Sequence, residues 1–155
     1  MGALLALPLL SAGTPPLGLR PPGRTASRFR DMDLSADREA YVWAEGLLQA
    51  AAPNGLILSR GDSQTFSLWY VRYGLRQRPD VVIVDRYLLA LPWYRADLAA
   101  RNPELASLLR ARHDQEAALM LLSIASRPVH LTYEDDLLLR HGTWSQDGPL
   151  YTLVR

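Results

Sequence analysis

Hydrophobic residues recur at helical spacing in several stretches of the chain. One apolar stripe follows Ser35, a good N-cap residue, and stops at Pro53-Asn54-Gly55; it consists of Ala40, Trp43, Ala44, Leu47, Leu48 and Ala51. A second helix is predicted to start at Asp62 and to carry Phe66, Trp69, Tyr70 and Tyr73 on one face, which the spacing assigns first to the core. Pro92 and Pro103 introduce two more helices, 93–100 and one from 103 that breaks near 112–114.

Short, continuous apolar runs lie between these helices. They cover 56–59, 81–84, 128–132 and 150–154, and their length and apolar character predict strands of a parallel sheet. Strands that alternate with helices predict a small three-layer α/β domain with a mostly parallel sheet of about four strands. We expect the first strand to be central, and the last strand can run antiparallel at an edge, because only a short connection precedes it.

The first thirty residues follow a different pattern. Residues 1–12 form an apolar run too short to span a bilayer and without preceding basic residues. This run fits either a degenerate signal sequence or the end of a membrane helix. Residues 13–30 are rich in proline, glycine and arginine, which is typical of a linker, although the arginines could also interact with anionic lipid headgroups. The predicted folded α/β domain is therefore residues 31–155.

Composition excludes several classes of function. Among 155 residues, 48% are hydrophobic, and 17 basic and 16 acidic residues give a net charge of +1, so neither a disordered chain nor a nucleic-acid-binding protein is expected. The absence of cysteine excludes a thiolate nucleophile and a cysteine-ligated metal. The absence of lysine excludes a P-loop. The three histidines lack metal-like spacing, and no cofactor or metal site is predicted.

Polar residues follow the predicted strands at the edge where ligands commonly bind in α/β sheets. Arg60 and Asp62 follow the first strand, Asp85 and Arg86 end the second, and Glu134 follows the third. Carboxylates with an arginine between them suit sugar hydroxyls or, less well, a divalent metal. Asp62 is interpreted first as an N-cap and second as a catalytic acid.

Aromatic residues are the second distinctive group. Trp93 and Tyr94 follow the second strand, close in sequence to the aromatic face of the 62–73 helix. Tryptophan and tyrosine with polar tips also form sugar-stacking and membrane-interface surfaces. The full candidate ligand crevice contains Arg60, Asp62, Thr65, Trp69, Asp85, Arg86, Trp93, Tyr94 and Glu134.

An ordered set of motifs resembles a family of bacterial multi-pass membrane proteins related to protein O-mannosyltransferases. The motifs are Gly61-Asp62-Ser-Gln-Thr65-Phe66-Ser-Leu68-Trp69-Tyr70, Arg78-Pro79-Asp80-Val81, Leu88-Leu89, Pro92-Trp93-Tyr94, Arg127-Pro128-Val129 and Gly148-Pro-Leu-Tyr151. The resemblance covers about residues 35 to 155.

The resemblance implies a soluble, extracytoplasmic part that follows the last membrane helix of a GT-C-type glycosyltransferase. Such enzymes use a polyprenyl-phosphate sugar and a catalytic acid in a loop between membrane helices, a portion that this sequence does not contain. We therefore expect an accessory domain without catalytic activity of its own. Its expected partners are the membrane part of the parent protein and an acceptor polypeptide or glycan, with no nucleic acid. The alternatives are a free-standing small α/β enzyme or a sugar-binding module using the crevice, and a purely structural or interaction module.

Overall fold

The computed structural model describes residues 37–154, and the compact unit that it contains begins at Arg38. The predicted apolar segment 1–12, the predicted linker 13–30 and the N-cap assigned to Ser35 lie outside the described residues. Within 37–154, no helix has the length and apolar character needed to cross a membrane.

The elements alternate between helix and strand, as the apolar pattern predicts. The first half contains α2 (Glu39–Ala50), β1 (Leu56–Ser59), α3 (Asp62–Trp69) with a π-helical turn η1 (Tyr70–Gly74), and β2 (Val82–Asp85). The second half contains the 3₁₀ turn η2 (Leu88–Ala90), α4 (Pro92–Arg101), the 3₁₀ segment η3 (Pro103–Arg110), α5 (Asp114–Ile124), β3 (Val129–Leu131), α6 (Asp136–Leu139), β4 (Thr143–Asp147) and β5 (Leu150–Val154).

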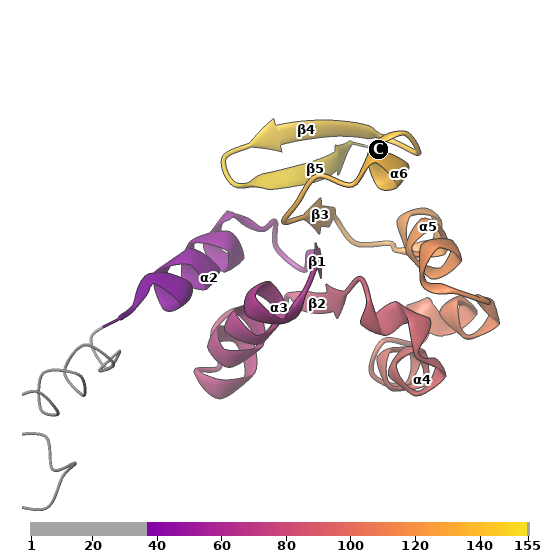
Figure 1. Ribbon diagram of the computed structural model, residues 1–155, viewed down its shortest axis with the longest axis horizontal. Coiled ribbons are helices and arrows are strands. Elements are labelled where there is room, and N and C mark those ends of the chain that lie inside the picture. Colours follow the sequence, from indigo (N-terminus) through magenta and orange to yellow (C-terminus); the bar gives the residue numbers. More distant parts are fainter. Residues whose placement is uncertain (1–36, 155) are drawn as a thin grey trace, which may run out of the picture. The chain divides into compact units, whose positions relative to one another are not determined.

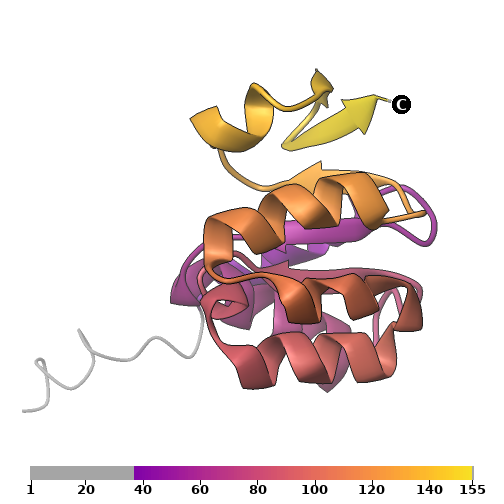
Figure 2. The same ribbon diagram turned by 90° about the vertical axis from the view of Figure 1, so that its right-hand side faces the viewer.

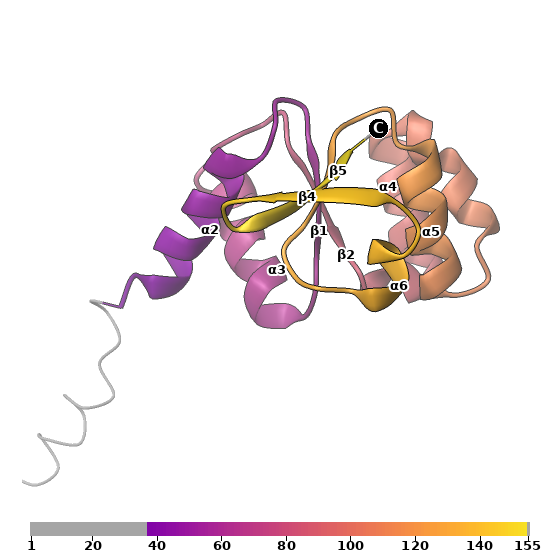
Figure 3. The same ribbon diagram turned by 90° about the horizontal axis from the view of Figure 1, so that it is seen from above.

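One five-stranded sheet, in the order β2-β1-β3-β5-β4, forms the middle of three layers (Figure 1). The strands β2, β1 and β3 are parallel, whereas β5 is antiparallel to both β3 and β4. Helices α2 and α3 cover one face, and α4, η3 and α5 cover the other (Figures 2 and 3). The three-layer α/β fold is therefore confirmed, and β1 lies inside the sheet between β2 and β3, whereas β3 is the middle strand of the five.

Each face of the sheet buries its own apolar cluster. On the α4–α5 side, Leu56, Leu58 and Val84 pack beneath helical leucines such as Leu121. On the α2–α3 side, Ile57 and Ile83 pack against Leu47, Leu48 and Leu68. Full burial of one such side chain contributes about 1.5–3 kcal/mol, so the alternating strand residues fix the register of the sheet.

Two predictions about the C-terminal region were wrong. Strand β4 and helix α6 were not predicted, and β5 lies inside the sheet while β4 forms its edge. Strand β4 has the sequence TWSQD, whose only large apolar residue is Trp144, because an edge strand with a solvated face needs little apolar surface.

Three predictions about the helices were also wrong. Gly61, not Asp62, occupies the N-cap of α3, and Asp62 is the first helical residue, exposed and without a capping hydrogen bond. The α3–η1 aromatic face points outward, since Phe66, Tyr70 and Tyr73 are 49–58% exposed while Leu68 is buried. Residues Ala40 and Trp43 of the predicted α2 stripe are exposed as well.

Candidate functional site

The carboxyl ends of β1 and β2 are joined by a buried network of side chains. Thr65 donates to a carboxylate oxygen of Asp85 at 2.5 Å, and its hydroxyl oxygen lies 2.8 Å from Ser59 Oγ. The other Asp85 oxygen accepts the backbone N–H groups of Tyr87 and Leu88, both at 2.8 Å. Both carboxylate oxygens are therefore occupied by protein donors, and the network holds β1, α3 and the start of η2 together.

Beyond these strand ends lies a small crevice of about 230 Å³ in which arginines meet carboxylates. The buried Arg86 donates to Asp114 at 2.6 Å, and its Nε lies 3.7 Å from Asp135. Arg60 donates to the Tyr87 hydroxyl at 2.8 Å, and its guanidinium lies 5.5 Å from the Tyr87 ring centroid. Arg60 and Arg86, two of the predicted candidate residues, both line this crevice.

Two predicted crevice residues take other positions. Asp62 is exposed at the start of α3, and it does not line the crevice. Glu134 accepts a hydrogen bond from the Tyr151 hydroxyl at 2.7 Å, at the surface of the hairpin strand β5. In the part of the chain that the structure describes, no three His, Asp or Glu side chains are grouped as metal ligands.

Three predicted residues, Trp69, Trp93 and Tyr94, instead line a larger pocket of about 570 Å³ beside the edge strand β2. The α3–η1 segment forms one wall and α4 forms the other, and β2 lies between these two helices (Figure 1). We call this cavity the β2-edge pocket. Its complete lining is Trp69, Arg72, Tyr73, Pro79, Asp80, Val81, Val82, Ile83, Trp93, Tyr94, Asp97, Leu98, Arg101, Asn102 and Arg127.

The backbone of β2 is protected at this edge by side chains from both walls. Val82 N–H donates to the Gly55 carbonyl just before β1, and Arg86 N–H donates to the Ser59 carbonyl at its end. Alternate residues, including Ile83, therefore direct their peptide groups away from β1 and toward the pocket. The Asp85 N–H, on the pocket side, donates to Tyr94 Oη at 2.9 Å. The Val81 carbonyl accepts from Arg72 Nε at 3.0 Å. Burial raises the pKa of Tyr94, so its hydroxyl stays neutral.

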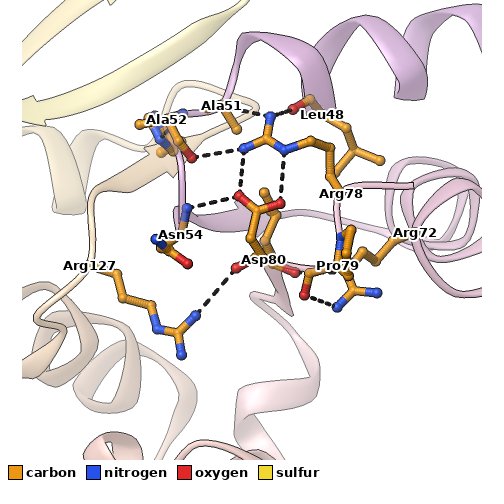
Figure 4. A network of polar contacts seen from close by, with 11 residues as sticks. Leu48, Ala51, Ala52, Asn54, Arg72, Arg78, Pro79, Asp80 and Arg127 are labelled. Atoms are coloured by element: carbon orange, nitrogen blue, oxygen red, sulfur yellow. Dashed lines mark hydrogen bonds and ion pairs between the residues drawn. The ribbon is translucent and has the colours of Figure 1, made fainter. Parts of the chain in front are cut away.

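The amino end of β2 is held by the turn that contains the Arg78-Pro79-Asp80 motif (Figure 4). The five guanidinium N–H groups of Arg78 reach the carbonyls of Leu48, Ala51 and Ala52 at the end of α2 and both carboxylate oxygens of Asp80. The Arg78 guanidinium also holds the pKa of Asp80 well below its usual range. This motif therefore positions the turn at one end of the pocket.

Sequence reasoning missed most of the polar residues of the β2-edge pocket. Asp97 and Arg101 follow Trp93 at four-residue intervals on α4, a spacing that places all three on one side of the helix. That four-residue periodicity in the sequence could have indicated that Asp97 and Arg101 lie beside Trp93. The position of Arg72 depends on the π-helical turn, in which Leu75 N–H donates to the Tyr70 carbonyl, and the sequence pattern does not indicate it.

A comparison with protein-family models finds a match over residues 40–115 to "TMEM260-associated domain 2". No solved structure matches this chain. The matched segment runs from α2 to the start of α5, and it contains every residue that lines the β2-edge pocket except Arg127. Over this segment the chain is therefore similar to a domain associated with TMEM260.

Proposed function

We propose that this chain is an accessory domain of a TMEM260-like, O-mannosyltransferase-related membrane protein, located on the extracytoplasmic side. The family-model match over 40–115 carries this proposal. The domain has no transferase activity of its own, and it supports the membrane part by binding an acceptor polypeptide or glycan. The GT-C character of the parent protein is part of the same proposal.

Two acidic residues near the strand ends, Asp85 and Asp135, are engaged by protein donors, and the exposed Asp62 lies outside the crevice. This arrangement favours the accessory role over an independent enzyme. A general acid or nucleophile needs an oxygen that can reach substrate. Asp85 is 3% exposed and uses both oxygens on protein donors, and Asp135 accepts the N–H groups of Leu137 and Leu138 at the start of α6. These carboxylates are engaged in holding the fold.

An activity assay tests the accessory role. The purified chain, incubated with a polyprenyl-phosphate sugar and an acceptor protein, should transfer no sugar. Deletion of the coding region for residues 38–155, with the remaining membrane protein still inserted, should lower glycosylation of acceptor proteins by membranes from the same cells. Transfer by the isolated chain, or full glycosylation after the deletion, would contradict the proposal.

The proposed location has its own test. Protease added outside intact spheroplasts should degrade the domain, whereas a cytoplasmic marker protein stays intact. Protection of the domain until the membrane is permeabilised would place it on the cytoplasmic side instead.

A further inference from the structure

The β2-edge pocket combines aromatic surface with polar groups at its rim. Trp93 is 62% exposed and Tyr73 49% exposed, so both walls of the pocket offer an accessible ring. The ring of Trp93 nevertheless has a defined orientation, because it meets Tyr94 edge-on at a centroid distance of 5.8 Å. Trp69 is held by Phe66 at 5.7 Å on the other wall.

The volume of the pocket and the burial of its floor restrict the ligand. A volume of about 570 Å³ lies in the range of small-molecule sites, roughly 300–1,000 Å³. An added peptide strand would need access to the backbone of β2, but Val81, Ile83 and Asp85 are only 1%, 2% and 3% exposed. The ligand must therefore be compact and held by side chains.

The charges of the pocket largely cancel, which argues against an anionic ligand. Arg101 pairs with Asp97 and Arg127 with Glu104, both at 2.9 Å. Asp80 is neutralised by Arg78 at 2.9 Å. Among the described residues that line the pocket, Arg72 is the arginine without an acidic partner, and its Nε and Nη2 donate to backbone carbonyls.

Hydrogen-bonding capacity remains on three side chains that line the pocket. Among the described residues, one terminal nitrogen of Arg72 and one of Arg127 have no recorded acceptor, and one oxygen of Asp97 has no recorded donor. Figure 4 places Arg72 and Arg127 on opposite sides of Asp80. Neutral polyols satisfy such a mixed set, since each hydroxyl both donates and accepts.

We propose that the β2-edge pocket binds a pyranose ring of a neutral glycan. The C–H face of the ring stacks on Trp93, with Trp69 on the opposite wall, and its hydroxyls bond Asp97 and the guanidinium groups of Arg72 and Arg127. The inference rests on the proposed accessory role only in naming the ligand class. The location of the binding site follows from the pocket itself, and this pocket is distinct from the predicted crevice at the carboxyl ends of the strands.

The test uses the full chain with ¹⁵N-labelled tryptophan, whose four indole N–H signals are assigned by single Trp→Phe variants. The probes are methyl pyranosides of glucose, galactose and mannose, N-acetylglucosamine and their disaccharides. At least one probe should shift the signals of Trp69 and Trp93 in a saturable manner while Trp43 and Trp144 stay unchanged. Absence of any shift, or shifts confined to Trp43 or Trp144, would overturn the proposal.

Two variants provide the matched comparison. Trp93→Ala should weaken binding at least about tenfold, equivalent to about 1.4 kcal/mol, because it removes the stacking surface. Trp43→Ala removes a partly exposed tryptophan from α2, outside the pocket, and should bind the glycan as the parent does. Equal affinity of the Trp93→Ala variant would refute the site.

A peptide probe distinguishes a polypeptide ligand from a glycan. If a short acidic peptide shifts Trp69 and Trp93 while no saccharide does, the pocket is a polypeptide site and the glycan proposal is wrong. These binding measurements do not involve sugar transfer, so their failure and the failure of the proposed accessory role are distinguishable.

Discussion

Replacing Arg78 with methionine tests how the pocket is supported. Methionine keeps a long apolar side chain but removes the guanidinium, which contacts five oxygen acceptors at 2.5–3.1 Å. Three of these acceptors are carbonyls near the C-terminal end of α2, where backbone acceptors lack helical partners. The variant therefore loosens the connection of α2 to the turn before β2.

The expected loss follows from the burial of this side chain. Breaking a fully buried ion pair costs about 3–5 kcal/mol, whereas an exposed pair is worth about 0–1 kcal/mol. The Arg78 and Asp80 side chains are 25% and 30% exposed, so water can reach some of the vacated acceptors. We expect the free energy of unfolding to fall by about 2–3 kcal/mol and the melting temperature by roughly 6–15 °C.

Urea unfolding followed by tryptophan fluorescence measures this loss, and Arg76→Met is the matched control. Arg76 lies in the same loop and has a similar positive φ, 58° against 47° for Arg78, but it is exposed and makes no recorded contact within residues 37–154. It should lose less than about 0.5 kcal/mol. Equal losses in the two variants would refute the assigned role of the Arg78 guanidinium.

The pH dependence of the same comparison isolates the ion pair. Because Arg78 lowers the folded-state pKa of Asp80, the carboxylate stabilises the fold above its unfolded pKa near 4, and this contribution is lost as pH falls below that value. The difference between the parent and Arg78→Met should therefore be smaller at pH 3 than at pH 7. A difference that does not change with pH would assign the whole loss to the carbonyl contacts.

Three further predictions concern buried hydrogen bonds. Burial, and then the charge of Arg78, lower the pKa of His130, whose Nε2 accepts the Ala52 N–H at 3.1 Å. The neutral His130 therefore contributes its full stabilisation above about pH 6.5, and the urea midpoint of the parent should decline as pH falls below that value. The urea midpoint of the His130→Gln variant should stay level between about pH 7 and 5.5. Tyr94→Phe should cost about 1–2 kcal/mol in a thermal melt because Asp85 N–H loses its acceptor, whereas Tyr73→Phe, a matched change on a half-exposed ring, should cost nearly nothing. Thr65→Val should lower the free energy of unfolding by about 2–3 kcal/mol, because it removes the hydroxyl that bonds Asp85 and Ser59. Thr65→Ser should retain most of the parent's stability in the same thermal melt. Equal melting temperatures for the two Thr65 variants, or for the two Tyr variants, would contradict these assignments.

Buried elements were predictable from the sequence because apolar continuity identifies them directly. The strand Leu56–Ser59 is buried along its whole length, and its apolar run indicated both its extent and its place inside the sheet. Strand Thr143–Asp147 gave no such signal, because its place in the sheet is set by antiparallel pairing with Leu150–Val154 across a turn at Gly148, where φ is 69°. Edge strands are specified by their neighbours more than by their own composition.

The candidate site was predictable only in part, for a related reason. Helical spacing placed Phe66, Trp69, Tyr70 and Tyr73 on one face, but spacing alone does not show whether a face is buried. The face was assigned to the core, whereas most of its rings are exposed in the structure. Residues expected in one crevice are divided by the edge strand: Arg60 and Arg86 lie beyond the strand ends, while Trp69 and Trp93 line its open side. The order of the strands determines which residues line the same pocket. Because that order depends on the pairing of all five strands, the local sequence pattern does not indicate it.

The protection of strand β2 connects the fold with the proposed ligand. An open edge strand invites pairing with another chain, and here Tyr94 and Arg72 occupy two of its outward backbone groups. The same side chains line the β2-edge pocket, so protecting the edge also builds an aromatic and polar cavity. Exposed rings at Tyr73 and Trp93 are not needed for that protection, because neither donates or accepts a recorded hydrogen bond at the edge. Both rings therefore remain accessible on the two walls of the pocket, as stacking on a pyranose ring requires.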